Sequence, residues 1–222
     1  YYIIFLINKV YRMPSPLIDT HCHLDFDAFD KDRAEVLEAA VLKGVCAIIH
    51  PAITVQNFDR VVELSQNQTQ HPDLRIYPTF GLHPCFIHQH QHDDLIHLEK
   101  MIQQYVPIAV GECGLDFFMA QPETELPPTD LQREQQHQKQ LFLFEGQLKL
   151  ARHYQLPVII HARKSLDHVI NLIKKVNAMT SDQLSFVPPL RGVVHCFSGS
   201  LVQANRIMAL GFYVGFGGPI TY

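Results

Sequence analysis

The stretch Leu17-Ile18-Asp19-Thr20-His21-Cys22-His23-Leu24-Asp25-Phe26 ends an apolar run with two alternating histidines. Side chains two residues apart leave the same face of a β-strand, so His21 and His23 can bind one metal ion while Cys22 points away. Four further strand-like runs end in a candidate ligand or a turn. They are Thr79-Phe80-Gly81-Leu82-His83-Pro84, Ile108-Ala109-Val110-Gly111-Glu112, Val158-Ile159-Ile160-His161 and Gly192-Val193-Val194-His195.

Strand-like and helical patterns alternate along the chain. The predicted strands cover 17–24, 45–49, 75–82, 108–110, 158–160, 193–194 and 212–216, and the predicted helices cover 30–42, 57–64, 95–105, 131–154, 165–176 and 201–210. Successive strand–helix units with short connections indicate a parallel sheet. Apolar runs without alternation fit strands that are covered on both faces. We predict an α/β fold, a TIM (β/α)8 barrel with its active site at the carboxyl ends of the strands. A doubly wound open sheet is the alternative, but it would not bring together ligands from strands one, four, five and six.

Only seven strands are evident, because the chain stops at Tyr222, directly after the seventh. We therefore expect the sequence to be C-terminally incomplete, and a seven-strand barrel would leave two unpaired edges. Residues 1–12 contain an apolar run, 1–10, that has no basic residues ahead of it and no cleavage pattern and is too short to span a bilayer. We expect them to be a non-native or disordered extension, and residues 13–222 to be one metal-dependent hydrolase barrel domain.

Composition limits the classes of function. With 222 residues and a formal net charge of −4, the chain has no broad basic field to attract a polyanion. A nucleic-acid substrate would have to be held by a local cluster or by the metals. Five cysteines without a CxxC pair indicate reduced thiols in a cytoplasmic protein. Cys22, Cys113 and Cys196 adjoin candidate ligands and are predicted to be small buried hydrophobes behind the site.

Six short motifs occur in order: Asp19-Thr20-His21-Cys22-His23, Gly81-Leu82-His83-Pro84, Gly111-Glu112-Cys113-Gly114-Leu115-Asp116, His161-Ala162-Arg163, His195-Cys196-Phe197-Ser198-Gly199 and Gly215-Phe216-Gly217-Gly218. From about Leu17 to Tyr222 the chain resembles the TatD-type metal-dependent deoxyribonucleases. The resemblance implies a divalent-metal-dependent hydrolase, a deoxyribonuclease of the 3′–5′ exonuclease type that cleaves phosphodiester bonds by a two-metal mechanism.

The resemblance also implies a ligand set. His21 and His23 would bind one metal, Glu112 would bridge two metals, and His161 and His195 would bind the second. The family's remaining ligand is an Asp at the end of the eighth strand, beyond the sequence given. The donor chemistry agrees, since imidazoles with carboxylates suit two divalent ions, Zn or Mn, with Mg possible. Two ions about 3.5–4 Å apart can polarise a phosphoryl oxygen, generate hydroxide and stabilise the leaving oxygen.

Beside Glu112, two further residues are candidate catalytic groups. Arg163 follows His161 by two residues, so on a continuing strand it shares that face and could hold a substrate phosphate by a bidentate pair. A surface salt bridge is the equally open alternative. His83 ends the third strand in a His-Pro turn, and we expect it to line the site and contact substrate or water rather than bind metal.

Other polar residues near these motifs are less informative. Asp19 shares the face of His21 and could orient it, although a buried structural carboxylate fits as well. Asp116 lies four residues past Glu112, beyond the predicted strand, and its role stays open. The histidines at 88, 90, 92 and 97 are predicted to form a polar solvated loop and helix start rather than another metal site.

Three functions compete. The first is a metal-dependent nuclease that acts on DNA, as single strands or from an end, through phosphate contacts with little base reading. The second is a small-molecule ester, lactone or amide hydrolase of the same barrel class. A Glu at 112, where many of those hydrolases use Lys, favours the nuclease. The third is a non-catalytic truncated fragment. We expect DNA as the partner, no membrane, no stable protein partner and a cytoplasmic location.

Overall fold

Seven parallel strands and six α-helices alternate in the part of the chain that the structure describes, residues 16–66, 72–118, 129–179 and 188–217 of a computed structural model. The predicted extension 1–12 lies outside these residues. The strands are β1 (Leu17–Asp19), β2 (Val45–Pro51), β3 (Arg75–Thr79), β4 (Val110–Asp116), β5 (Val158–Arg163), β6 (Gly192–Val194) and β7 (Phe212–Val214). The helices are α1 (Arg33–Leu42), α2 (Phe58–Gln66), α3 (Asp94–Tyr105), α4 (Asp130–His153), α5 (Leu166–Asn177) and α6 (Leu201–Met208). Short 3-10 turns cover Asp27–Phe29, Val55–Asn57 and Pro84–Phe86.

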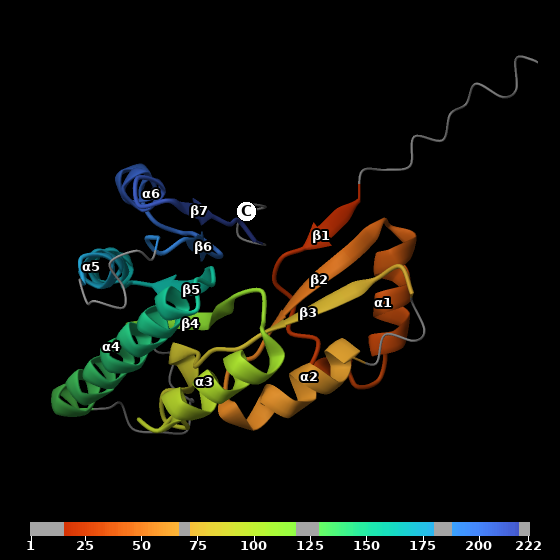
Figure 1. The fold of residues 1–222 in the computed structure, drawn as a ribbon, viewed down its shortest axis with the longest axis horizontal. Coiled ribbons are helices and arrows are strands. Elements are labelled where there is room, and N and C mark those ends of the chain that lie inside the picture. The colour runs from red at the N-terminus through yellow and green to blue at the C-terminus, as the bar shows by residue number, and fades with distance from the viewer. Residues whose placement is uncertain (1–15, 67–71, 119–128, 180–187, 218–222) are drawn as a thin grey trace, which may run out of the picture.

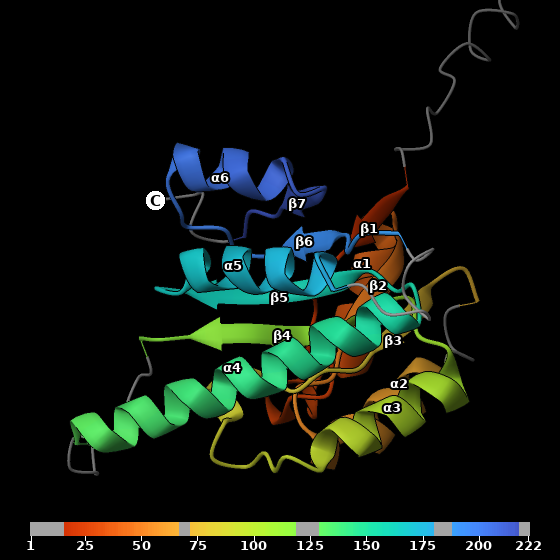
Figure 2. The same ribbon diagram turned by 60° about the vertical axis from the view of Figure 1, so that its left-hand side comes forward.

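The strands follow one another in sequence order. One sheet has the order β1-β2-β3 and the other β4-β5-β6-β7, and a parallel bridge between Phe80 and Val110 joins them. Helices α1 and α2 lie outside the first sheet, and α4, α5 and α6 outside the second (Figures 1 and 2). The sequential order confirms the predicted parallel α/β architecture and rules out a doubly wound sheet for the described residues, because such a sheet reverses its order midway.

Strand limits differ from the prediction in ways that affect the site. β1 stops at Asp19, so His21 and His23 lie in the segment after the strand and not on it. β4 and β5 run further than predicted, so Glu112 and His161 lie inside strands. Asp116 is therefore the last residue of β4 rather than part of the following loop.

Helix starts follow local capping chemistry. At the start of α4, the Thr129 side chain accepts the Gln132 N–H, and the Gln132 side chain accepts the Thr129 N–H. Ser200 and Gln203 form the same reciprocal pair at α6. Each pair satisfies N–H groups that the first helical turn leaves without a partner.

The core lies between the strands and the outer helices. Every residue of β4 is buried, and so are Val158, Ile159 and Ile160 on β5, which agrees with strands covered on both faces. Phe144 and Leu148 of α4 belong to the same buried cluster. None of the helices in the described ranges is long and apolar enough to cross a bilayer.

Gly114 lies where the backbones of β4 and β5 leave no room for a side chain. Its φ is +137°, and a Cβ there would lie 2.0 Å from the carbonyl oxygen of His161, its partner in the sheet. A side chain at 114 would thus strain the backbone and push apart the strands that carry Glu112 and His161.

We predict that Gly114→Ala lowers the free energy of unfolding by about 3–5 kcal/mol, as the sum of backbone strain and overpacking. Gly211→Ala is the matched control, because Gly211 has a φ of +83° and no atom lies within 4 Å of the position that a Cβ would take there. In the control the free energy of unfolding should fall only by the cost of the backbone strain, about 1–2 kcal/mol. Urea unfolding followed by circular dichroism measures both, and equal losses would contradict the steric argument.

Candidate metal centre

Five imidazoles surround the carboxylate of Glu112, which is 1% exposed. Glu112 Oε2 lies 2.9 Å from His21 Nε2 and 3.1 Å from His23 Nε2. Glu112 Oε1 lies 3.1 Å from His83 Nε2 and 3.4 Å from His161 Nδ1, and it contacts His195 Nε2. The structure therefore brings together all five residues predicted as ligands, and His83 with them.

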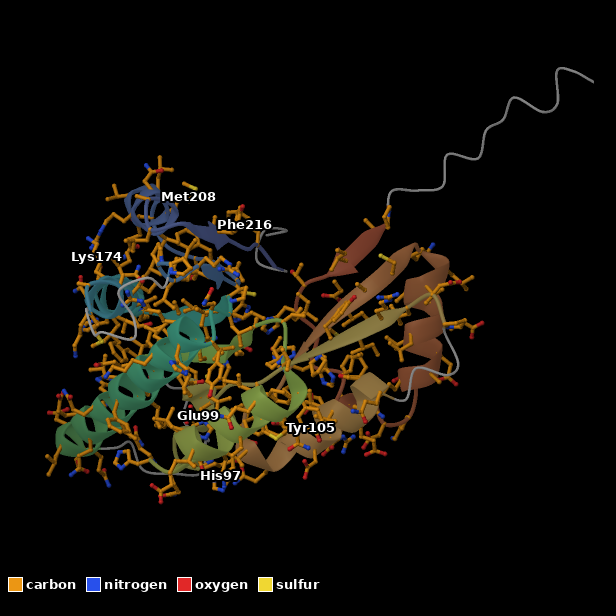
Figure 3. The ribbon with its side chains drawn as sticks, viewed as in Figure 1. His97, Glu99, Tyr105, Lys174, Met208 and Phe216 are labelled. Atoms are coloured by element: carbon orange, nitrogen blue, oxygen red, sulfur yellow. The ribbon has the colours of Figure 1, made fainter. Side chains whose placement is uncertain are left out.

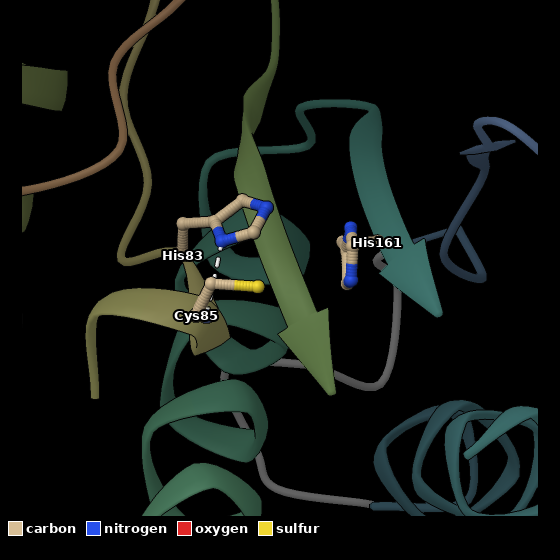
Figure 4. Close-up of side chains that lie close together, drawn as sticks. All are labelled: His83, Cys85 and His161. Atoms are coloured by element: carbon tan, nitrogen blue, oxygen red, sulfur yellow. Dashed lines mark hydrogen bonds between the residues drawn. The ribbon is translucent and has the colours of Figure 1, made fainter. Parts of the chain in front are cut away.

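Two sets of possible ligand atoms can be distinguished. His21, Glu112 and His195 offer three atoms that all lie within 4.8 Å of one another, and the rings of His21 and His195 stack with centroids 4.1 Å apart. His83, Cys85 and His161 form a second such set, in which the Cys85 sulfur points toward His161 (Figure 4). The cavity over the centre has a volume of about 470 Å³.

The donor arrangement fits divalent metal. His21 Nε2 and His23 Nε2 lie 3.1 Å apart, and Glu112 Oε1 and His195 Nε2, although in close contact with their neighbours, are buried with no well-aligned hydrogen bond among the described residues. Buried polar atoms normally have partners, so nitrogen and oxygen lone pairs gathered in this way are suited to a shared cation.

A buried network fixes the segment that carries His21 and His23. His23 Nδ1 lies 3.1 Å from the carbonyl oxygen of Pro51, which indicates that Nδ1 donates and leaves Nε2 as the free donor atom for a metal. Two residues further on, Asp25 Oδ1 lies 3.0 Å from His50 Nε2, and Asp25 Oδ2 accepts from Asn57 Nδ2 at 2.7 Å. The loop is thereby tied to the end of β2 and to the turn before α2.

Asp116 orients His161. Its Oδ2 lies 2.9 Å from His161 Nε2, and its Oδ1 accepts the Phe118 N–H at 2.9 Å. A carboxylate on one ring nitrogen fixes the tautomer and leaves the other nitrogen, Nδ1, facing Glu112. The Cys85 thiol donates to the same Oδ2 at 3.3 Å, and the Cys85 N–H donates to His83 Nδ1.

Two buried glutamines of α4 hold the main chain at the site. Gln147 bonds both the N–H and the C=O of Leu82, at 2.7 and 3.2 Å. Gln140 bonds both the N–H and the C=O of Asp116, at 2.8 and 3.0 Å. Each side-chain amide takes the place of a neighbouring strand, so the residues next to His83 and the orienting carboxylate are held firmly.

The pKa values of Glu112 and Asp116 are both lowered, so both carboxylates stay ionised. Burial raises the pKa of Glu112, but the imidazoles of His161 and His195 outweigh it and hold that pKa well below its usual range. For His161, burial lowers the pKa, yet hydrogen bonds to Asp116 and other neighbours raise it to about 11. Burial lowers the pKa of His195. The centre thus combines buried negative charge with clustered imidazole nitrogens, a setting that a cation would stabilise.

Two other predicted residues lie at the edge of the centre. Arg163 does not line its cavity; its guanidinium stacks on the Phe118 ring at 4.0 Å, at the end of β5. Asp19 accepts the main-chain N–H of His21 at 3.1 Å, so it fixes the backbone and not the ring.

The cysteine and histidine predictions are corrected in part. Cys113 is buried as predicted, whereas Cys22 is only half-buried against the smaller apolar cluster. Cys196 is exposed, because β6 ends two residues earlier and strand alternation no longer applies. In the histidine run, His97 faces outward on α3 (Figure 3), whereas His90 is fully buried and its Nε2 bonds the His83 carbonyl at 2.9 Å. The solvated-loop prediction is wrong for His90.

Sequence reasoning missed the supporting residues. Asp25, His50, Asn57 and the two glutamines of α4 carry no motif that a single sequence reveals, since their partners lie far away along the chain. Cys85 had a weak signal, its position directly after the predicted His-Pro turn.

A buried carboxylate among imidazoles, carried on or just after the parallel strands β1, β3, β4, β5 and β6, is typical of metal-dependent barrel hydrolases. The chain belongs to the TatD related DNase family, whose sequence profile matches residues 18–222. It is 38% identical over 207 residues to the uncharacterized metal-dependent hydrolase YjjV of Escherichia coli K12, a match that covers 92% of this chain and 69% of that protein. It is 32% identical over 200 residues to the 3′-5′ ssDNA/RNA exonuclease TatD of Rahnella sp., a match that covers 88% of this chain and 65% of that protein.

The fold comparison agrees. The crystal structure of the Escherichia coli YjjV protein, a TatD homologue, superposes with a TM-score of 0.75 and covers 93% of this chain and 70% of that one. The predicted family and barrel-type fold are therefore confirmed.

We predict that Asp116→Asn lowers the affinity for Zn²⁺ by about 10- to 100-fold, because an amide nitrogen facing His161 Nε2 disturbs the tautomer while the remaining oxygen can still accept the Phe118 N–H. Isothermal titration with Zn²⁺ measures this, and circular dichroism checks the fold. Asp59→Asn, which removes an exposed charge on α2, is the control and should bind normally. Equal affinities in the two variants would show that Asp116 does not orient a ligand.

Proposed function

We propose that the chain is a divalent-metal-dependent nuclease that removes nucleotides from the 3′ end of DNA, as single strands or frayed ends. The observation that carries the proposal is the convergence of five imidazoles on the buried Glu112 carboxylate. The named activity of the Rahnella relative supports a nucleic-acid substrate over a small ester, lactone or amide.

The residues present would hold two ions. His21 and His23 would bind one, His161 and His195 the other, and Glu112 would offer one oxygen to each. Zn, Mn or Mg bound there would polarise a phosphoryl oxygen and lower the pKa of a water molecule. The chain's own groups set the geometry, since Asp116 orients His161 and the Pro51 carbonyl orients His23.

Glu112, Arg163 and His83 are the proposed catalytic residues. His83 lies 3.1 Å from Glu112 Oε1 and is 7% exposed at the cavity wall, where it can contact substrate or water. Arg163, exposed at the end of β5, can bind a phosphate through two parallel N–H groups.

The setting is proposed to be the cytoplasm, with residues 13–222 forming one domain. All five cysteines are free thiols, which suits a reducing compartment. DNA is the proposed partner, bound mainly through its phosphates.

We predict that hydrolysis of single-stranded DNA needs added Mn²⁺, Mg²⁺ or Zn²⁺ and is abolished by EDTA. Glu112→Gln should lose at least about 100-fold in rate, because bound metal supplies several kcal/mol of transition-state stabilisation. Metal content per protein should also fall. Glu35→Gln, on the exposed face of α1, is the control. Unchanged metal content and rate in Glu112→Gln would exclude the carboxylate as a bridge.

A competition between substrates tests the class of reaction. We predict faster turnover of an oligodeoxynucleotide than of lactone, carboxylic ester or amide substrates under the same metal conditions. Release of mononucleotides with shortening from the 3′ end is expected in gel and chromatographic assays. A clear preference for a non-phosphate substrate, with no nucleotide released, would overturn the proposal in favour of a small-molecule hydrolase.

A further inference from the structure

A second cavity of about 560 Å³ lies beside the metal centre. Its walls include Ala162 and Arg163 at the end of β5, Lys164 directly after β5, and Phe197 and Gly199 in the segment after β6. The cavity of the metal centre is lined by residues just before these in the sequence, among them His161 on β5 and His195 and Cys196 after β6. One or two residues along a strand correspond to about 3–7 Å, which is close to the spacing of successive phosphates in an extended nucleic-acid strand.

Positive charge in this second cavity is not neutralised. Among the described residues, none forms an ion pair with Arg163 or Lys164, and both are exposed. Asp167, an acid on the described part of the wall, pairs with Arg206 and accepts from Gln203 Nε2 at 3.1 Å. In a chain of formal net charge −4, two unpaired cations at one cavity favour an anionic ligand.

The two cations are also held in place. The Phe118 ring lies 4.0 Å from the Arg163 guanidinium carbon and 5.5 Å from Lys164 Nζ. Such stacking orients a guanidinium while leaving its N–H edge free for phosphate. Lys164 has a φ of +54°, an unusual conformation for a residue with a side chain, and the Ser165 hydroxyl ties the loop to the Leu115 carbonyl at 2.7 Å.

Aromatic surface joins the two cavities. Phe197, half-buried, lines the second cavity, and its ring lies edge-on to that of Phe216 at 6.4 Å. Phe216, at the end of the segment after β7 (Figure 3), is 63% exposed and lines the metal centre's cavity. Exposed rings beside cations are what single-stranded nucleic acids stack on.

We propose that this second cavity binds the nucleotide next to the scissile phosphate, with Arg163 and Lys164 on its phosphate and Phe197 against its base. The inference rests on the proposed nuclease function and adds to it a nucleotide subsite. Substrates with two or more phosphates should therefore be preferred over compounds with a single phosphodiester.

Two variants test the subsite, Lys164→Ala and Phe197→Ala. The readout is the kcat/KM for a tetrathymidylate divided by that for bis(p-nitrophenyl) phosphate, which has one phosphodiester and cannot fill both cavities. We expect this ratio to fall about tenfold in each variant, in keeping with a lost stacked base or phosphate contact. Lys174→Ala, on the outer face of α5 (Figure 3), is the charge-matched control and should keep the ratio. An unchanged ratio in Lys164→Ala and Phe197→Ala would overturn the subsite.

Binding provides an independent measurement. The metal-loaded protein is titrated with a fluorescent tetrathymidylate whose phosphorothioate linkages keep their charge and resist hydrolysis. Lys164→Ala should weaken binding and reduce the slope of log Kd against log salt by about 0.7, the value for one phosphate on a single strand. Phe197→Ala should weaken binding without changing the slope, and Phe197→Tyr should restore it.

The two proposals fail in different ways. If neither phosphodiester is hydrolysed, the nuclease function is wrong, and the binding experiment alone decides whether the cavity takes nucleotides. If DNA is hydrolysed but Lys164→Ala and Phe197→Ala bind the tetrathymidylate as the unmodified protein does, the subsite is wrong and the nuclease function stands.

Discussion

The buried carboxylate of Glu112 is the constraint on which the rest of the site depends. An ionised group taken out of water costs several kcal/mol unless compensating groups surround it. Compensation here comes from five imidazoles that follow or belong to β1, β3, β5 and β6, with Glu112 itself on β4. Adjacent parallel strands bring side chains that are far apart in sequence to one point, so the sheet order supplies the geometry of the centre.

Much of this could be predicted from the sequence, because parallel strands place their carboxyl ends together. The spacing of His21 and His23 and the single polar residues that close apolar runs at Glu112, His161 and His195 marked these side chains as candidates, and the family resemblance implied that they are ligands. The strand alternation assumed for His21 and His23 was wrong, because β1 ends at Asp19. The ends of β1 and β4 were less predictable. β1 has three residues and β4 has seven, and the length of a strand depends on tertiary contacts rather than on local preference.

The supporting layer could not be predicted, for a physical reason. His50 and Gln147 are buried and Asn57 is half-buried, and polar side chains tolerate such burial because distant partners bond them. Composition and periodicity report a polar residue as exposed unless its partner is known, so this layer becomes visible only in three dimensions. The same reasoning explains His90, whose partner is a main-chain carbonyl.

The paired glutamines of α4 restrict how this chain can vary in length. Gln140 and Gln147 stand seven residues apart, about two helical turns; Gln140 bonds the main chain at the end of β4, and Gln147 bonds the main chain of Leu82 in the segment after β3. Adding or deleting one residue between them would rotate one amide by about 100° around the helix axis and withdraw it from its partner. Substitutions on the outer face of α4 should be well tolerated, whereas insertions and deletions within this interval should be selected against even though they lie far from any metal ligand.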